Sequence, residues 1–346
     1  MISRVADSCF WLTRYLERVD TLARLLEVNE AFQLDADLPS AERWRPLVVV
    51  SGAEEHFIEQ VGAGAIDDPE AVQSYLTWDP EAPASIFSSM RWARENARTI
   101  RETMSVEMWE SINDLWLWLR DRQAERLYHK DRAAFYDYLC KQCMLFHGIC
   151  YSTMLHEEPF VFMKLGRAVE RVGQTARILD VKHHALGDAP GESETTVDAA
   201  QWLAILRSCS AFEPFFKRSA HVLSGPSVAG FLILDRTFPR SVLHNLDRTR
   251  GLLIRLRGEE AAGTRRSSWD LLERFRGQLV QMDVEDVQEW GVHKTLTWIV
   301  DTNAELCEAI HQDYLDPPIE ALRHTVRIAH DPSHRPPVQE QSQSLG

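Results

Sequence analysis

Apolar residues recur every three to four positions along most of this chain, which is the spacing of helices that bury one face. No segment is convincing as a strand, so the pattern predicts an all-α fold. Helices are expected at about 3–33, 41–52, 68–79, 85–103, 106–127, 132–154, 159–186, 198–219, 239–257, 267–281 and 284–313, with another beginning near Pro226.

The first predicted helix carries a charged strip. At roughly 100° per residue, its polar side chains fall within about 120° of arc, and leucines and valines occupy the other side. Exposed ion pairs, worth a few tenths of a kcal/mol each, are the simplest interpretation of such a strip. The strip consists of Arg14, Glu17, Arg18, Thr21 and Arg24.

The strip recurs in the second half of the chain. With an offset of 153 residues, its four charged positions return as Arg167, Glu170, Arg171 and Arg177. With an offset of 156 residues, Asp79, Pro83 and Ser85 return as Asp235, Pro239 and Ser241. This self-similarity predicts an internally duplicated helical bundle, made of two repeats at about 1–153 and 154–315.

The two repeats are expected to pack in a pseudo-twofold relation, as in a covalently joined dimer. A single domain over 1–315 is therefore predicted, with a polar linker at 187–196 inside the second repeat. Residues 316–346 form a C-terminal extension that is expected to be disordered from about 330.

Charge and composition narrow the function. The chain has 38 basic and 52 acidic residues, so it offers no general attraction for nucleic acid. Its N-terminus lacks an apolar signal region, and no segment reaches about 18 uncharged apolar residues, so we expect a cytoplasmic protein outside the membrane. The six cysteines are too few and too scattered for a disulfide framework.

The two charged helices predict a central site if they face each other. Glu17 and Glu170 would then lie among six arginines, which is either a structural ion-pair network or a site for a carboxylate or phosphate. A third interpretation makes Glu17 or Glu170 a catalytic general base, although neighbouring arginines lower a carboxyl pKa and weaken the base. The arginines are Arg14, Arg18, Arg24, Arg167, Arg171 and Arg177.

The repeated Asp-Pro-Ser motif has two interpretations. One is a turn in which Ser85 or Ser241 caps the next helix. The other is an anion cradle at the helix N-terminus, held by Asp79, Ser85, Asp235 and Ser241. Downstream, Arg94, Glu95 and Arg98 would add a charged face, of which the second repeat keeps only Arg250 in place of Arg94.

Metal and cofactor sites are not predicted. Cys140, Cys143, His147 and Cys150 share one stripe of one helix, which cannot normally wrap four ligands around one ion, so we expect them in the core. No phosphate-binding loop, dinucleotide fingerprint or nucleophile elbow is present. The tryptophans at 109, 116 and 118 indicate a helix that is buried all round or that meets a partner protein.

Four segments of the chain carry a resemblance to a known family. They are SRVADSCFWLTRYLERVDTLARLLEV, SSMRWARENARTIRE, LGRAVERVGQTARILDV and FLILDRTFPRSV, and they span about 3–315. Together they resemble the bacterial α-E family, whose function is unknown. The resemblance implies an all-helical fold with characteristic glutamate and arginines. It also implies gene linkage to a circularly permuted ATP-grasp protein and to transglutaminase-like cysteine peptidases. Where family members often have Gly-Arg-Tyr-Leu-Glu-Arg in both copies, this chain has Thr13 in the first and Ala168-Val169 in the second.

From these features we expect an accessory or substrate-binding subunit of an ATP-grasp-linked peptide ligation or modification system. It would bind an anionic peptide or a phosphorylated intermediate at the central Arg/Glu site. Two alternatives stay open: an enzyme that uses Glu17 or Glu170 in amide-bond chemistry, and a scaffold in which the charges are purely structural.

Overall fold

The computed structural model describes residues 3–33, 40–186, 196–218, 223–257 and 266–315. Within these ranges the chain forms sixteen α-helices and no strand, which confirms the all-α prediction. The C-terminal extension and nearly all of the predicted linker lie outside the described residues.

The helices of the first half are α1 (Ser3–Gln33), α2 (Ser40–Val50), α3 (Glu54–Gln60), α4 (Pro69–Trp78), α5 (Ile86–Thr99), α6 (Val106–Leu119), α7 (Arg122–Lys130) and α8 (Arg132–Thr153). Those of the second half are α9 (Glu158–Leu186), α10 (Thr196–Ser208), α11 (Phe212–Arg218), α12 (Gly225–Leu234), α13 (Val242–Arg257), α14 (Ser267–Gln281), α15 (Val284–Trp290) and α16 (Val292–Ile310).

Three of the predicted helices are each divided into two helices in the structure. The predicted helix at 106–127 ends at Leu119, because the Asp121 carboxylate caps α7 by accepting from the Gln123 N–H at 2.7 Å. The one at 198–219 is interrupted by Ser210, whose φ is 52°. The one at 284–313 is divided by Gly291, whose φ of 96° is incompatible with a helix. Helix α3 was not predicted.

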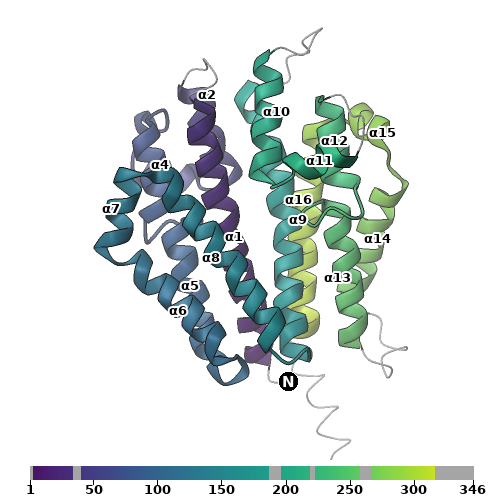
Figure 1. The fold of residues 1–346 in the computed structure, drawn as a ribbon. Helices are drawn as coiled ribbons and strands as arrows, with labels where there is room; N and C mark the ends of the chain where they lie inside the picture. Colours follow the sequence, from purple (N-terminus) through teal and green to yellow (C-terminus); the bar gives the residue numbers. More distant parts are fainter. Residues whose placement is uncertain (1–2, 34–39, 187–195, 219–222, 258–265, 316–346) are drawn as a thin grey trace, which may run out of the picture.

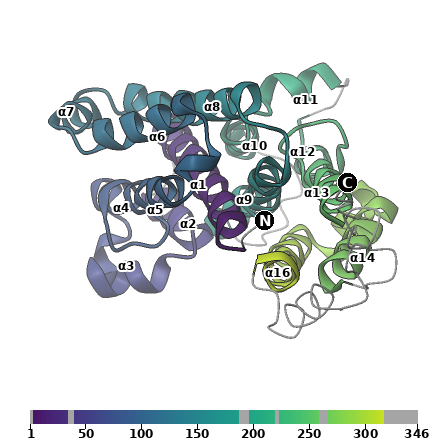
Figure 2. The same cartoon turned by 90° about the horizontal axis from the view of Figure 1, so that it is seen from below.

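The long helices α1 and α9 lie side by side at the centre and run in the same direction (Figure 1). Helices α5 and α8 pack against α1, and α13 and α16 pack against α9, on opposite sides of the central pair (Figure 2). The second helix of each half packs on the central helix of the other half, since α2 contacts α9 and α10 contacts α1. This arrangement accords with a pseudo-twofold axis along the central helices, while the duplication itself stays a prediction.

Buried side chains from both halves form one hydrophobic core that extends from Ala6 to Leu315. The thiols of Cys140, Cys143 and Cys150 are buried in it, as predicted. Trp116 is buried as well, and the neighbouring tryptophans at 109 and 118 are packed partly buried against the core.

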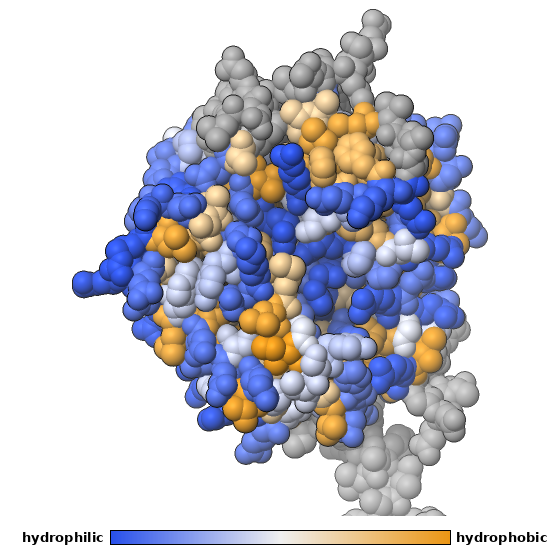
Figure 3. Space-filling view, viewed as in Figure 1, coloured by the Kyte–Doolittle hydropathy of each residue, from blue (hydrophilic) through white to orange (hydrophobic). Residues whose placement is uncertain are grey.

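The face seen in Figure 3 is mainly hydrophilic, with separate apolar patches over α8 and near α11. On α8, Met144, Leu145 and Tyr151 are exposed. None of the described helices combines the length and the apolarity that a membrane span requires.

Candidate functional site

The two central helices exchange ion pairs. On one side, Glu170 of α9 accepts hydrogen bonds from Arg14 Nε at 2.8 Å and Arg18 Nε at 2.7 Å, both from α1. On the other side, Glu17 of α1 accepts from Arg167 Nε at 3.1 Å and Arg171 Nε at 2.6 Å, both from α9. The predicted strips therefore face each other, and each glutamate is held by the arginines of the opposite helix.

Glu17 has a further partner that the sequence did not predict. Arg240, which precedes the first turn of α13, donates from Nη1 to Glu17 at 3.1 Å. Its Nη2 binds the carboxylate of Asp20, one turn after Glu17 on α1. The spacing of Asp20 and Arg24 along α1 was a signal for an i, i+4 pair, and these two residues are 2.8 Å apart.

Both central glutamates are ionised and are poor bases. Burial alone would raise the pKa of Glu17, but the guanidinium groups of Arg171, Arg240 and Arg167 outweigh it and hold the pKa well below its usual range. Burial also raises the pKa of Glu170, which Arg18 and Arg14 then lower strongly. A carboxylate with so low a pKa accepts protons poorly at neutral pH.

His147 of α8 lies 4.0 Å from the Glu17 carboxylate, measured from its Nε2. Burial, together with the positive charge of Arg167, lowers its pKa well below the usual value, so the ring is neutral. Its Nε2 forms no hydrogen bond with the described residues. Among these residues, no group of three or more potential ligands could hold a metal ion.

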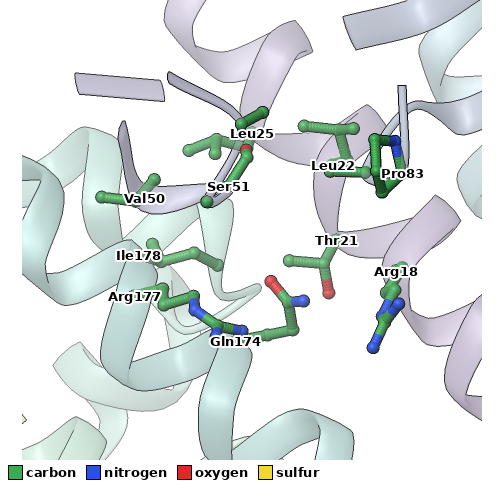
Figure 4. A pocket seen from close by; sticks show the side chains of 13 residues that line it. Arg18, Thr21, Leu22, Leu25, Val50, Ser51, Pro83, Gln174, Arg177 and Ile178 are labelled. Atoms are coloured by element: carbon green, nitrogen blue, oxygen red, sulfur yellow. The ribbon is translucent and has the colours of Figure 1, made fainter. Parts of the chain in front are cut away.

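A pocket opens on the Glu170 side of the central pair, and we call it the Arg177 pocket (Figure 4). Its volume is about 190 Å³, and it lies between α1, α9, the end of α2 and the loop before α5. Leu22, Leu25, Val50, Pro83, Ala84 and Ile178 supply apolar walls. Its polar side chains are Arg18, Thr21, Ser51, Gln174 and Arg177.

Two polar groups of this pocket have no partner among the described residues. Arg177 makes no hydrogen bond or ion pair with the residues that the structure describes. Thr21 is 2 % exposed, and its hydroxyl has no hydrogen-bond partner within the same residues. In contrast, Gln174 donates to Glu170 at 3.0 Å. Figure 4 shows Arg177 and Gln174 on one wall, with Thr21 and Arg18 opposite them.

Burial lowers the pKa of the Arg177 guanidinium. Glu170 opposes this effect, whereas the positive charges of Arg18 and Arg14 add to it, and the net direction is downward. The cation is therefore less stable here than in water. An anion placed in the pocket would relieve both the lost solvation and the repulsion.

The six predicted arginines thus divide by environment. Four of them neutralise the central glutamates, and Arg24 pairs with Asp20 instead of with a glutamate. Only Arg177 is left without an acceptor in the described part of the chain, while Arg18 serves Glu170 and also lines the pocket.

The repeated Asp-Pro-Ser motif forms a capped turn in both halves. The Ser85 hydroxyl donates to the Asp79 carbonyl at 2.5 Å and accepts from the Ser88 N–H at 3.0 Å. Ser241 likewise donates to the carbonyl of Asp235. Both serines are fully buried and the capped turn accounts for these contacts, so the anion-cradle interpretation of the motif gains no support.

The charged face of α5 lies apart from the central cluster. Arg94 donates to the Asn113 side chain of α6 at 3.1 Å and pairs with Glu95 at 2.9 Å. Glu95 also pairs with Arg98 at 2.8 Å. These residues do not reach Glu17, Glu170 or the Arg177 pocket, so their assignment to an anion site gains no support.

Comparisons with known proteins agree with this architecture. Residues 1–315 match the model of the Alpha-E family, described as a predicted alpha-helical domain with a conserved ER motif. Glu17-Arg18 and Glu170-Arg171 spell that dipeptide at the centre of the molecule. No solved structure matches the chain.

Relatives include uncharacterized proteins of Mycobacterium bovis and of Mycobacterium tuberculosis strain CDC 1551, each 23 % identical over 342 residues. Another from M. tuberculosis strain H37Rv is 22 % identical. These matches cover 90 % of this chain but only 36 % of each relative, so the chain spans about a third of the length of the curated relatives it matches. With its helical architecture and its two central Glu-Arg pairs, the chain belongs to the Alpha-E family.

Proposed function

We propose that this chain is a cytoplasmic accessory or substrate-binding subunit of an ATP-grasp-linked peptide ligation or modification system. It binds an anionic group of the peptide, or of a phosphorylated intermediate, in the Arg177 pocket. The ATP-grasp protein is the expected partner, and a transglutaminase-like peptidase is the second partner of the proposal.

One observation carries the binding part of the proposal. Arg177 borders a cavity without an acceptor from the described residues, and the buried Thr21 hydroxyl beside it has none either. A partly buried cation has lost some of its hydration, and a buried hydroxyl costs free energy unless a partner satisfies it. A guanidinium group matches carboxylate and phosphate oxygens with two parallel N–H donors. The pocket therefore presents the donors that an anion needs.

The volume of the Arg177 pocket favours a ligand of which only one end enters the pocket. Pockets that enclose drug-sized molecules measure roughly 300–1,000 Å³. The Arg177 pocket, at about 190 Å³, has room for one anionic group and a short stem. The remainder of a peptide would stay outside, which suits a subunit that presents its ligand to a partner enzyme.

The low pKa of both central glutamates disfavours the enzyme alternative, because neither is suited to remove a proton at neutral pH. The length of the mycobacterial relatives is compatible with an accessory role. In each of them, about two thirds of the chain lies outside the match, so the matched region belongs to a larger protein.

Calorimetric titration of the full chain with the capped dipeptide N-acetyl-Glu-Glu-amide tests the binding step, with N-acetyl-Gln-Gln-amide as the uncharged control. We expect the wild type to bind only the acidic dipeptide, and Arg177→Met to bind it about tenfold more weakly or worse. Arg274→Met is the matched control, because it removes an exposed arginine of α14 that has no ion pair among the described residues. Equal affinity of the wild type and Arg177→Met would refute the assignment.

The partner is tested by reconstitution with an ATP-grasp protein of the kind that the family resemblance implies. We expect ATP turnover with a peptide substrate to depend on the added chain, and Arg177→Met to lower that stimulation. Turnover by the isolated chain would support the enzyme alternative. Full ligation without the chain would contradict the accessory role.

A further inference from the structure

The two halves differ next to their central glutamates. With the offset of 153 residues, Asp20 corresponds to Gly173, and with the offset of 156 residues, Arg240 corresponds to Ala84. The ion pair between Arg240 and Asp20, which lies beside Glu17, therefore has no counterpart beside Glu170. Ala84 instead lines the Arg177 pocket, so part of the cavity is the space that a long side chain fills in the other half.

The same comparison explains why Arg177 has no acceptor in the part of the chain that the structure describes. Its counterpart Arg24 donates to the Asp20 carboxylate, four residues earlier in the helix, at 2.8 Å. Four residues before Arg177 stands Gly173, which has no side chain. A Cβ added at Gly173 would lie 3.3 Å from the Asn303 amide nitrogen, a tight contact that Gly173→Asp and Gly173→Asn share, and 3.7 Å from Arg177 Nη1. A carboxylate carried at that position would therefore reach the guanidinium.

We infer that the pocket selects a carboxylate on a short aliphatic stem, which takes the place that the Asp20 carboxylate occupies beside Arg24. This inference rests on the proposed function and narrows its ligand to peptides that offer an acidic side chain or a free C-terminus. One carboxylate oxygen pairs with Arg177, and the Thr21 hydroxyl is available to donate to the other. The stem contacts the apolar walls at Leu25 and Ile178.

The walls also disfavour phosphate. A phosphate group has more oxygens than a carboxylate, and in a pocket with several leucine, valine and isoleucine side chains some of them would stay without donors. A carboxylate with a methylene stem matches both the donors and the apolar surface. We therefore expect the carboxylate to bind about tenfold more tightly than inorganic phosphate.

The test uses the full chain and three probes in calorimetric titrations. N-acetylglutamate α-amide offers a side-chain carboxylate, N-acetyl-glycylglycine offers a C-terminal one, and inorganic phosphate is the comparator. The probe that binds more tightly shows whether the pocket prefers an acidic side chain or a free C-terminus. Gly173→Asp places a carboxylate beside Arg177, and Gly173→Asn places an uncharged side chain of the same shape there.

We expect Gly173→Asp to weaken the carboxylate probe about tenfold more than Gly173→Asn does, and to melt at a higher temperature than Gly173→Asn. Equal losses in both variants would show that the effect is steric and would overturn the inference. Phosphate that binds the wild type as tightly as the carboxylates would also overturn it, while leaving the proposed anion site intact. Absence of any anion binding would refute the proposed function, and the difference in melting temperature would still report on the missing partner of Arg177.

Discussion

Gly166 on α9 faces the backbone carbonyl of Phe10 on α1 so closely that a Cβ at position 166 would lie 2.1 Å from the Phe10 oxygen. Near this contact, the Thr13 hydroxyl donates to the Met163 carbonyl at 2.6 Å. Thr13 occupies the position that corresponds to Gly166 in the other half. The central helices are thus in backbone contact at one of the two positions and joined by a hydrogen bond at the other.

Gly166→Ala is therefore expected to push α1 and α9 apart and to destabilise the fold by about 3 kcal/mol. Gly148→Ala is the matched control, since Gly148 is an exposed helical glycine of α8 with nothing within 4 Å of an added Cβ. Gly148→Ala should raise the free energy of unfolding by roughly 0.5–1 kcal/mol, because alanine favours a helix more than glycine does. Urea denaturation of both variants measures the difference, and equal midpoints would contradict the close-contact explanation.

Glu17→Gln tests the ion pairs at the centre. It leaves Arg167, Arg171 and Arg240 without their shared carboxylate, and removal of one partner from a buried pair costs about 3–5 kcal/mol. Glu95→Gln removes a carboxylate that pairs with Arg98 on the surface of α5 and should cost less than about 1 kcal/mol. A small effect of Glu17→Gln in urea denaturation would mean that the cluster contributes little to stability.

Acid should unfold the protein through the same glutamates. Both have a lowered pKa in the folded state, compared with about 4.3 in an unfolded chain. Their contribution is therefore complete above about pH 5 and is lost as the pH falls, because the unfolded chain takes up protons that the folded chain excludes. Urea midpoints from pH 7 to pH 3 should fall more steeply for the wild type than for Glu170→Gln, and parallel slopes would contradict this origin.

The difference between the two halves predicts a coupled pair of substitutions. Ala84→Arg alone places a third cation beside Arg18 and Arg177, and should destabilise. Combined with Gly173→Asp it should recreate the pair that Arg240 and Asp20 form beside Glu17. A double-mutant cycle in urea should give a favourable coupling of about 1–3 kcal/mol. Additive effects would show that the two sides of the central pair are not equivalent in geometry.

Helical periodicity was enough to predict the fold class, the central helices and most helix bounds, because burial of one face repeats every turn. Three breaks were missed for local reasons. Gly291 and Ser210 adopt positive φ, and Asp121 starts a new helix inside an otherwise continuous helical pattern. These breaks depend on single residues, which a periodicity averaged over a window does not resolve.

The sequence by itself determined that two copies of an Arg-Glu strip exist and that their charges need partners. Only the tertiary structure decided which arginine serves which glutamate, because Arg240 reaches Glu17 from 223 residues away in the chain. It also decided that Arg177, identical in type and spacing to Arg24, has no acceptor among the described residues, whereas Arg24 pairs with Asp20. An ion pair depends on the positions of both partners in three dimensions. For Arg177 the decisive feature is the absence of a side chain at Gly173, and a single glycine in a helix does not reveal from the sequence alone that a neighbouring arginine has lost its acceptor.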